Sequence, residues 1–347
     1  MFIKKTKAAI LVKQKKPLVI DTIILPKKLK AGQVLVELIY SGICGSQLGE
    51  IEGVKGPDKF LPHLLGHEGI ASVLEVGPRV KKVRKNDRVL LHWMPSSGIN
   101  SQNPNYFWKN KKLNAGLVTT FNEHCIVSEN RITKIKKNFD MLSSLLLGCT
   151  ASTALSSVFK LSKVAKNSVA AVSGCGAIGL YVIKILNYLK VKDIIAIDLD
   201  NKKLDLAKKY GASFLLNNKS RSIDVEIKKR FVNGVNYFFE CSGNSKVISQ
   251  AFKALHKEGS EILIGVPSFK EEAKFYTLDI NLGKKIIGSK GGDFNPDKDF
   301  LSYSQIINKE QFNNNSFIYN KIKLDDINQL FSDMRKSKII GKSIIVY

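Results

Sequence analysis

One strand–turn–helix segment constrains the fold of this chain more than any other part of the sequence. Residues 169–173 form a strand-like run, the glycine-rich turn Gly174-Cys175-Gly176-Ala177-Ile178-Gly179 follows, and a helical period continues through Leu189. The first glycine permits a tight turn, the second lets the backbone approach a pyrophosphate, and the third allows close helix–strand packing. The N–H groups at the helix start are unpaired and attract the anion. The segment therefore predicts a dinucleotide site.

An acid ends the next predicted strand, Ile194–Asp198. A carboxylate at this point accepts hydrogen bonds from both ribose hydroxyls of the cofactor and repels a 2′-phosphate, which predicts NAD rather than NADP. The alternative is a generic α/β turn without a ligand. The combination of strand, turn, helix and acid argues against that alternative.

The pattern of apolar residues changes at about residue 150. Before it, short alternating or apolar runs predict strands, and the polar segment 95–114 predicts a long loop. After it, strand-like runs alternate with helical periods, which predicts a parallel sheet with helices on its faces. The predicted strands beyond the two named above are 34–40, 70–76, 88–92, 125–127, 235–240, 261–266 and 344–347.

The composition argues for a cytoplasmic globular protein. No apolar run reaches the roughly 20 residues that span a bilayer, and the apolar stretch 8–12 is too short for a signal peptide. The five cysteines are widely spaced, which favours reduced thiols over disulfides. The net charge is +25, but the lysines are spread along the whole chain. A non-enzymatic nucleic-acid-binding protein, which concentrates its basic residues in one patch, is therefore the weaker alternative.

Three residues are candidate metal ligands: Cys44, His67 and Cys149. Two thiolates and an imidazole suit zinc, and three protein ligands leave a fourth position for water or substrate. The three residues lie far apart in the sequence. Their residue types alone favour two buried cysteines and a core histidine.

Several short motifs, taken together, resemble the zinc-containing alcohol dehydrogenases of the medium-chain dehydrogenase/reductase superfamily. They occur in the order of that family, and the similarity extends from near residue 7 to the C-terminus. The motifs are Ser41–Ser46, Gly66–Glu68, Gly148–Thr153, Gly174–Gly179, Ile195–Asp198, Ile264–Pro267 and Gly288–Gly292. The resemblance implies an α/β protein in which a Rossmann domain with a doubly wound parallel sheet, residues 151–290, is inserted into a β-rich GroES-like catalytic domain, residues 1–150 and 291–347. It also implies a homodimer or homotetramer.

The resemblance assigns roles around the metal. Cys44, His67 and Cys149 are then the ligands of one catalytic zinc, and Glu68 is the nearby acid that approaches the metal during ligand exchange. Ser46 hydrogen-bonds the substrate oxygen and starts a proton relay, for which a hydroxyl that both donates and accepts is suited. Trp93 falls where an aromatic residue forms a wall of the substrate pocket.

It assigns further roles around the cofactor. Thr153 and Ile178 press the nicotinamide ring towards the zinc. Asp198 binds the adenosine ribose, with Lys203 beside it. Gly174, Gly176, Gly179 and Ile264 complete the expected NAD contacts.

The sequence departs from the family pattern in ways that change these expectations. The stretch Met94–Asn114 has no cysteine where many relatives hold a second, structural zinc with four, so one zinc per chain is predicted. We expect Tyr106, Phe107 and Trp108 to pack that part of the chain instead. Ala71 replaces the glycine that usually follows the His-Glu pair.

Two further departures concern proton and metal chemistry. Gln47 replaces an acid that orients the histidine ligand in relatives, which alters the basicity of that ligand. Gly49 occupies the place of the histidine that ends the proton relay, which leaves water, Glu50 or His63 as the exit.

The sequence as a whole predicts an oxidoreductase that moves hydride between an alcohol and NAD, giving the aldehyde or ketone, or the reverse. A zinc-free quinone or enoyl reductase on the same scaffold is the alternative enzyme. The presence of Cys44, His67 and Cys149 argues against it. The substrate stays open among simple alcohols, polyols, sugar derivatives and phosphorylated carbonyls.

Overall fold

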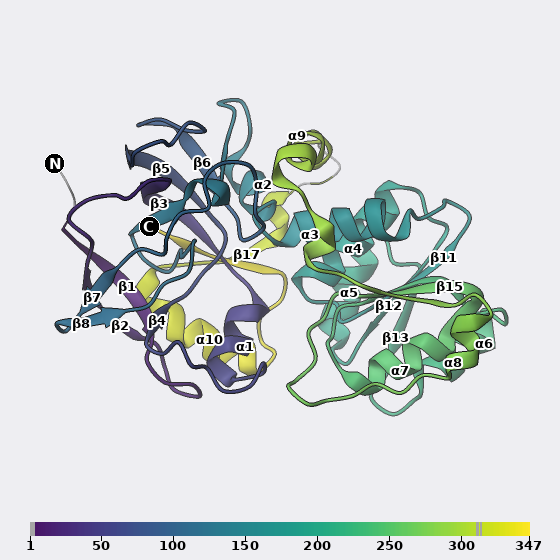
Figure 1. Cartoon of the computed structure of the whole chain (residues 1–347). Helices are drawn as coiled ribbons and strands as arrows, with labels where there is room; N and C mark the ends of the chain where they lie inside the picture. Colours follow the sequence, from purple (N-terminus) through teal and green to yellow (C-terminus); the bar gives the residue numbers. More distant parts are fainter. Residues whose placement is uncertain (1–3, 310–311, 313) are drawn as a thin grey trace. The chain divides into compact units, whose positions relative to one another are not determined.

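The computed structural model describes residues 4–309, 312 and 314–347, and the chain divides into two compact units (Figure 1). The first unit combines residues 1–149 with 295–347, and the second comprises residues 150–294. Residues 291–294, which the sequence places with the first unit, belong to the second, because Gly292 packs against Ser156. Among the described helices, none combines the length and the apolarity that a bilayer crossing requires.

Two antiparallel sheets with one parallel strand pair form the frame of the first unit. In one sheet the strand order is β4-β1-β2-β7-β8, and in the other it is β10-β6-β5-β3-β18-β17, with β9 also hydrogen-bonded to β3. Only β17 and β18 run parallel among these described strands. The strands are β1 (Lys5–Leu11), β2 (Val19–Ile24), β3 (Gln33–Ile43), β4 (His63–Leu64), β5 (Gly69–Val76), β6 (Arg88–Leu91), β7 (Tyr106–Trp108), β8 (Lys111–Leu113), β9 (His124–Ser128), β10 (Ile132–Lys134), β17 (Ile318–Ile322) and β18 (Lys342–Val346).

Helices of the first unit pack against these strands. The amphipathic helix α10 places Ile327, Leu330 and Phe331 in one core cluster with Phe121 and Ile345, so the C-terminal tail folds back on the N-terminal half. The helices are α1 (Gly45–Glu52), α2 (Met141–Leu146), α9 (Pro296–Ile307) and α10 (Ile327–Arg335), with 3₁₀ turns η1 (Glu129–Arg131), η5 (Asn314–Phe317) and η6 (Leu324–Asp326).

The predicted long loop at 95–114 is wrong in its second half, where β7 and β8 form a hairpin. Tyr106 and Leu113 face each other in this hairpin and are fully buried, so two apolar anchors hold a segment that is otherwise polar. Trp108 donates its indole N–H to Asp21 at 2.8 Å. The expectation for Phe107 is wrong, because its side chain is 43% exposed. Each of these two strands has only one buried residue, which is too few to form the alternating apolar pattern that predicts a strand.

The second unit is a doubly wound parallel sheet. Its strand order is β13-β12-β11-β14-β15-β16, so the chain leaves β11 in one direction and returns on its other side with β14. Such a reversal opens a crevice at the carboxyl ends of β11 and β14, which is where ligands bind in this class of sheet. The strands are β11 (Val169–Ser173), β12 (Asp193–Asp198), β13 (Phe214–Asn217), β14 (Val235–Glu240), β15 (Leu255–Leu263) and β16 (Lys285–Gly288).

Helices cover both faces of this sheet (Figure 1). On one face, Ile223 and Phe252 pack on Ala171 and Phe238. The helices are α3 (Thr150–Ser156), the π-helical turn η2 (Ser157–Ser162), α4 (Ala177–Tyr188), α5 (Asn201–Lys209), α6 (Ile223–Arg230), α7 (Ser245–Ala254), α8 (Thr277–Asn281) and the 3₁₀ turn η3 (Gly291–Asp293). The fold is therefore the predicted one, a Rossmann domain joined to a β-rich domain built from both ends of the chain.

Candidate functional site

Strand pairing in the first unit brings three distant segments to one place. Strand β3 is hydrogen-bonded to β5 with Ser41 opposite Gly69, and to β18 with Ile43 opposite Ser343. The residues just beyond these pairs are Cys44 at the start of α1, the His67–Glu68 pair before β5, and Lys342 at the start of β18. The backbone bond from Gly42 N–H to Glu68 C=O, 3.1 Å, fixes the first two segments together. The topology thus brings Lys342, near the C-terminus, together with Cys44 and His67 of the N-terminal half.

Cys44, His67 and Cys149 form one compact group. Their potential ligand atoms all lie within 4.8 Å of one another. Cys149, which follows α2 in the sequence, is buried, while Cys44 and His67 are half-buried. Nε2 of His67 is buried and has no hydrogen-bond partner among the described residues. Two sulfurs and an orphaned imidazole nitrogen at this spacing are the donor set that zinc prefers.

The group is also electrostatically prepared for a cation. The pKa of the Cys44 thiol is held well below its usual value, first by its hydrogen bond with Cys149 and then by the nearby His67 imidazole. The pKa of the Cys149 thiol is raised, first by its hydrogen bond with Cys44 and then by burial. The Cys44 thiol therefore ionises at a lower pH than the Cys149 thiol. A cation shared by the two sulfurs would favour the thiolate form of both.

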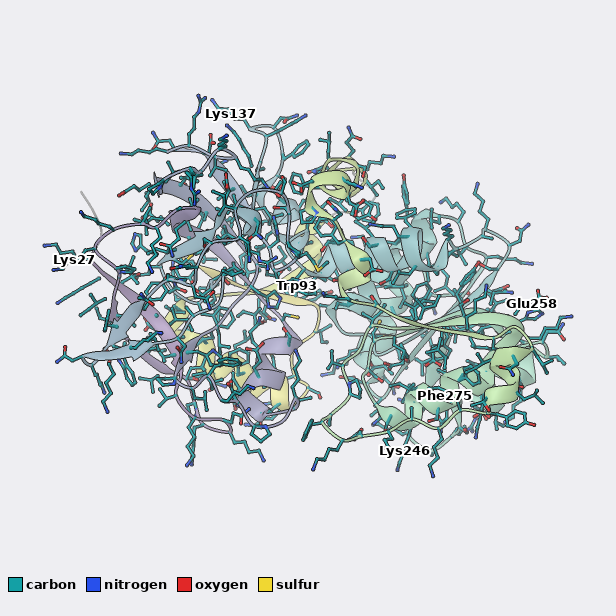
Figure 2. All side chains as sticks on the ribbon, viewed as in Figure 1. Lys27, Trp93, Lys137, Lys246, Glu258 and Phe275 are labelled. Carbon is teal, nitrogen blue, oxygen red and sulfur yellow. The ribbon has the colours of Figure 1, made fainter. Side chains whose placement is uncertain are left out.

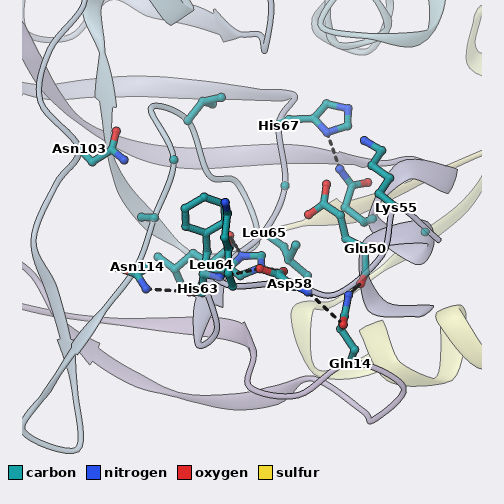
Figure 3. Close-up of a pocket in the computed structure, with 18 of the residues that line it drawn as sticks. Gln14, Glu50, Lys55, Asp58, His63, Leu64, Leu65, His67, Asn103 and Asn114 are labelled. Atoms are coloured by element: carbon teal, nitrogen blue, oxygen red, sulfur yellow. Dashed lines mark hydrogen bonds and ion pairs between the residues drawn. The ribbon is translucent and has the colours of Figure 1, made fainter. Parts of the chain in front are cut away.

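Gln47 contacts two members of the group from the first turn of α1. Its Oε1 accepts the backbone N–H of Cys44 at 2.8 Å, and its Nε2 lies 2.5 Å from Nδ1 of His67 (Figure 3). The side chain is 1% exposed. It occupies the place where the sequence comparison with the family expects an acid, and it fixes the imidazole plane.

Glu68 lies beneath the group in a fully buried ion pair with Lys342. The two residues are 0% and 1% exposed at their side chains. Gly42 leaves room for the carboxyl, because a Cβ there would lie 2.4 Å from the Glu68 carboxyl carbon. Burial alone would lower the pKa of Lys342, but Glu68 and the two thiols together raise it, so the ammonium stays charged.

Lys342 is a residue that sequence reasoning missed. Because the chain has 55 lysines and arginines, its sequence does not distinguish one buried lysine from the many exposed ones. Lys342 lies two positions before Ile344, where the apolar run of the last predicted strand begins.

Ser46 and Trp93, the two other residues predicted for the catalytic site, also lie in the first unit. The hydroxyl of Ser46 is buried and has no hydrogen-bond partner among the described residues, so it is available to another group. Trp93, which is labelled in Figure 2, follows β6 in the sequence and is half-buried. It does not line the cavity of about 630 Å³ that His67 shares with Gln47 and Glu50.

The glycine turn of the second unit has the geometry of an anion site. Gly179 packs so closely that a Cβ there would lie 2.1 Å from the carbonyl oxygen of Gly174, whereas nothing lies within 4 Å of a Cβ placed on Gly176. Helix α4 starts here, and no side chain caps its first N–H groups. Open backbone at a helix start suits a pyrophosphate.

Asp198 connects this turn to the next strand end. Its carboxylate accepts the backbone N–H groups of Cys175 at 2.7 Å and of Asp200 at 3.0 Å. Together with Gly174, it lines a cavity of about 650 Å³. The segment 218–222, which sequence reasoning did not single out, lines the same cavity and contributes Lys219 and Arg221.

The other predicted cofactor residues also lie in the second unit, but none of them lines this cavity. Thr153 is a buried residue of α3 and Ile178 a half-buried residue of the first turn of α4. Lys203 lies in α5, and Ile264 follows β15. Their roles stay predictions.

Comparison with known proteins gives matches along most of the chain. Residues 30–137 match the alcohol dehydrogenase GroES-like domain, and residues 177–309 match the zinc-binding dehydrogenase domain. The chain is 28% identical over 379 positions to an S-(hydroxymethyl)glutathione dehydrogenase of Escherichia coli strain SMS-3-5, which covers 99% of this chain and 100% of that protein.

Solved structures of similar proteins also superpose over almost the whole chain. Benzyl alcohol dehydrogenase of Acinetobacter calcoaceticus gives a TM-score of 0.88 at 25% identity, with 99% of each chain covered. The 2R,3R-butanediol dehydrogenase of Bacillus subtilis gives 0.79 at 26% identity, again with 99% of each chain covered.

Proposed function

This chain belongs to the zinc-containing alcohol dehydrogenases of the medium-chain dehydrogenase/reductase superfamily, and we propose that it transfers hydride between an alcohol and NAD, giving the aldehyde or ketone, or the reverse with NADH. The observation that carries this proposal is the convergence of two thiols and an orphaned imidazole nitrogen within 4.8 Å. A zinc-free reductase has no use for such a group.

Cys44, His67 and Cys149 hold one zinc per chain in this proposal. Bound there, zinc supplies a Lewis acid that polarises the oxygen of the reacting group. Ser46 hydrogen-bonds that oxygen and passes its proton on, which the unpartnered buried hydroxyl supports. Glu68, which is paired with Lys342 in the structure, is in this proposal the nearby acid that approaches the metal during ligand exchange.

The second unit binds NAD in this proposal. Gly174, Gly176 and Gly179 with the start of α4 receive the pyrophosphate, and Asp198 receives the adenosine ribose. The cavity of about 650 Å³ beside Asp198 supports this placement. The first unit is then the catalytic domain, and the whole protein is a homodimer or homotetramer, which light scattering would test.

Elemental analysis with an assay of NADH absorbance tests the proposal. We expect one zinc per chain and zinc-dependent turnover of an alcohol panel. Cys44→Ser and His67→Ala should lose zinc and turnover together. The control Cys241→Ser changes a cysteine outside the group and should keep its zinc. Full activity in the zinc-free Cys44→Ser variant would contradict the mechanism, and two zinc ions per chain would contradict the count.

The relatives named above carry the names of three different alcohols. Their names therefore select no single substrate class for this chain.

A further inference from the structure

Four strands of the first unit, β1, β2, β7 and β8, lie side by side in one antiparallel sheet (Figure 1). Their inward residues, among them Ile23, Tyr106 and Leu113, belong to one core cluster. Because side chains alternate along a strand, the residues next to these point away from the core. The sheet therefore also has an outer face.

One row of residues crosses this outer face. Lys5 pairs with Ile24, and Ile24 pairs with Phe107. Phe107 in turn pairs with Lys112. Paired residues of neighbouring strands point to the same side of a sheet, so these four side chains form one line. All four are exposed, and the exposed fractions of Ile24 and Phe107 are 40% and 43%. The row thus has an apolar centre with a lysine at each end.

Phe60 and Lys59 extend this face beyond β8. Asn114 follows Lys112 by two positions, so both side chains point to the same side. The Asn114 side chain donates to the backbone carbonyl of Phe60 at 2.7 Å (Figure 3). Phe60 is 62% exposed, and the ammonium of Lys59 lies 6.0 Å from the centre of its ring. We refer to these residues together as the basic–apolar face: Lys5, Ile24, Lys59, Phe60, Phe107 and Lys112.

The lysines of the basic–apolar face carry uncompensated charge. Lys5, Lys59 and Lys112 form no ion pair with any acid in the described part of the chain. Asp21 is the one acid within the described strands β1, β2, β7 and β8, and its carboxylate accepts the indole N–H of Trp108 at 2.8 Å. The face therefore combines exposed apolar side chains with a local excess of positive charge.

We propose that the basic–apolar face binds an anionic lipid surface, with Ile24, Phe60 and Phe107 inserted at the headgroup boundary and the lysines against the headgroups. Exposed apolar side chains gain free energy when they leave water for an apolar phase. Lysines add attraction to acidic headgroups, and their long stems let the ammonium groups stay at the headgroup level while the rings insert. A row with an apolar centre and basic ends meets both requirements.

Other occupants fit this face less well. A second copy of the chain would bring the same lysines together, and like charges repel. A single-stranded nucleic acid is attracted by lysines and stacks its bases on aromatic rings. It has no comparable use for Ile24, which a lipid interface buries as readily as it buries Phe107. The observations therefore favour lipid, and a nucleic acid forms a separate arm of the test.

Co-sedimentation of the full chain with lipid vesicles tests the proposal. At about 0.1 M salt we expect binding to vesicles of equal parts phosphatidylglycerol and phosphatidylcholine, and little binding to pure phosphatidylcholine. Phe107→Gln should weaken the partition coefficient by about tenfold, because one ring no longer inserts. Lys5→Gln combined with Lys112→Gln should weaken it by about 25-fold, since each lysine near an acidic surface contributes about fivefold, or about 1 kcal/mol.

Matched variants separate this face from the general basicity of the chain. Lys208→Gln combined with Lys253→Gln removes two exposed lysines of the second unit. Phe269→Gln removes a phenylalanine of the second unit that is 56% exposed. Both control proteins should bind the anionic vesicles almost as tightly as the parent chain. Equal losses for the Lys5 and Lys112 pair and for the control pair would mean that net charge alone drives binding, and the proposal would be wrong.

A fluorescence measurement tests the insertion itself. Phe107→Trp places an indole on the basic–apolar face, and brominated phosphatidylcholine in the anionic vesicles should quench its emission beyond the quenching seen for the two tryptophans of the parent chain. Phe269→Trp should show no such additional quenching. Vesicle binding without added quenching of Phe107→Trp would overturn the proposed insertion.

The nucleic-acid arm uses a fluorescent oligothymidylate in place of the vesicles. If the parent chain binds it, Phe107→Gln loses that binding and no vesicles are bound, the face is a nucleic-acid platform and the lipid proposal is wrong. Vesicle binding requires neither zinc nor turnover, so its outcome is independent of the proposed dehydrogenase activity.

Discussion

The side-chain nitrogen of Gln47 lies 2.5 Å from Nδ1 of His67, while the oxygen of the same amide accepts the Cys44 N–H. When His67 binds a metal through Nε2, the neutral ring carries its proton on Nδ1. Two N–H groups then face each other. If the amide is flipped, its oxygen accepts from Nδ1–H of His67, but its NH₂ group then faces the Cys44 N–H. One side-chain amide has only one acceptor atom, so it cannot satisfy both neighbours. A carboxylate at this position accepts from both neighbours.

We therefore expect Gln47→Glu to bind zinc about 10–100-fold more tightly than the parent chain, which is the usual range for a changed partner of a ligating histidine. Competition with a chromophoric chelator measures the affinity directly. Gln305→Glu, which adds the same charge on the exposed side of α9, is the control and should leave the affinity unchanged. Equal zinc affinities for the parent and Gln47→Glu would show that the amide does not weaken zinc binding.

The buried pair of Glu68 and Lys342 gives a prediction about stability. Lys342→Met leaves the Glu68 carboxylate buried without its counter-charge, which should lower the free energy of unfolding by about 3–5 kcal/mol. The double variant with Glu68→Gln should recover most of that loss, because no uncompensated charge remains. Urea unfolding of the zinc-free proteins measures both.

Lys338→Met is the matched control for this prediction. It removes an exposed lysine that lies 3.9 Å from Asp333, and pairs of this kind contribute less than about 1 kcal/mol. A Lys342→Met protein as stable as this control would mean that Glu68 takes up a proton without cost when its partner is lost.

The sequence predicted those parts of the site that have a local signature. Gly174 and Asp198 belong to a strand–turn–helix pattern in which spacing alone carries the chemistry. Cys44 and Cys149 have no such pattern. They could be joined only by resemblance, because the pairing of β3 with β5 and β18 is a long-range property of the sheet. Lys342 was out of reach for the same reason.

The coenzyme preference depends on Asp198 in our proposal. Asp198→Gly removes the carboxylate that repels a 2′-phosphate. The positive charges of Lys219 and Arg221 in the same cavity then attract that phosphate with no nearby Asp198 charge to offset them. We expect the ratio of kcat/KM for NAD to kcat/KM for NADP to fall by about tenfold or more, since one charge interaction of about 1.4 kcal/mol gives that factor. Asp200→Gly, which changes the neighbouring acid outside the cavity lining, should keep the ratio. An unchanged preference in Asp198→Gly would reject the role in ribose binding.

The stability of the second unit should fall as the pH rises, because of Glu261 on β15. Both carboxyl oxygens are buried and lack a partner among the described residues, and burial, with a smaller contribution from Glu240, raises the pKa to about 9. Between the unfolded value of 4.5 and this folded value, the folded chain holds a proton that the unfolded chain has released. The free energy of unfolding therefore decreases through this window, by up to about 1.4 kcal/mol per pH unit.

Glu261→Gln removes this titration while keeping the size and the neutral charge of the protonated side chain. Compared with the parent chain, the variant should gain stability steadily from pH 5 to pH 8, and urea unfolding followed by circular dichroism at several pH values measures the difference. Glu258→Gln, an exposed change on the same strand, should follow the parent curve. Parallel curves for Glu261→Gln and the parent would mean that Glu261 is ionised in the folded protein, and that a donor reaches its carboxylate after all.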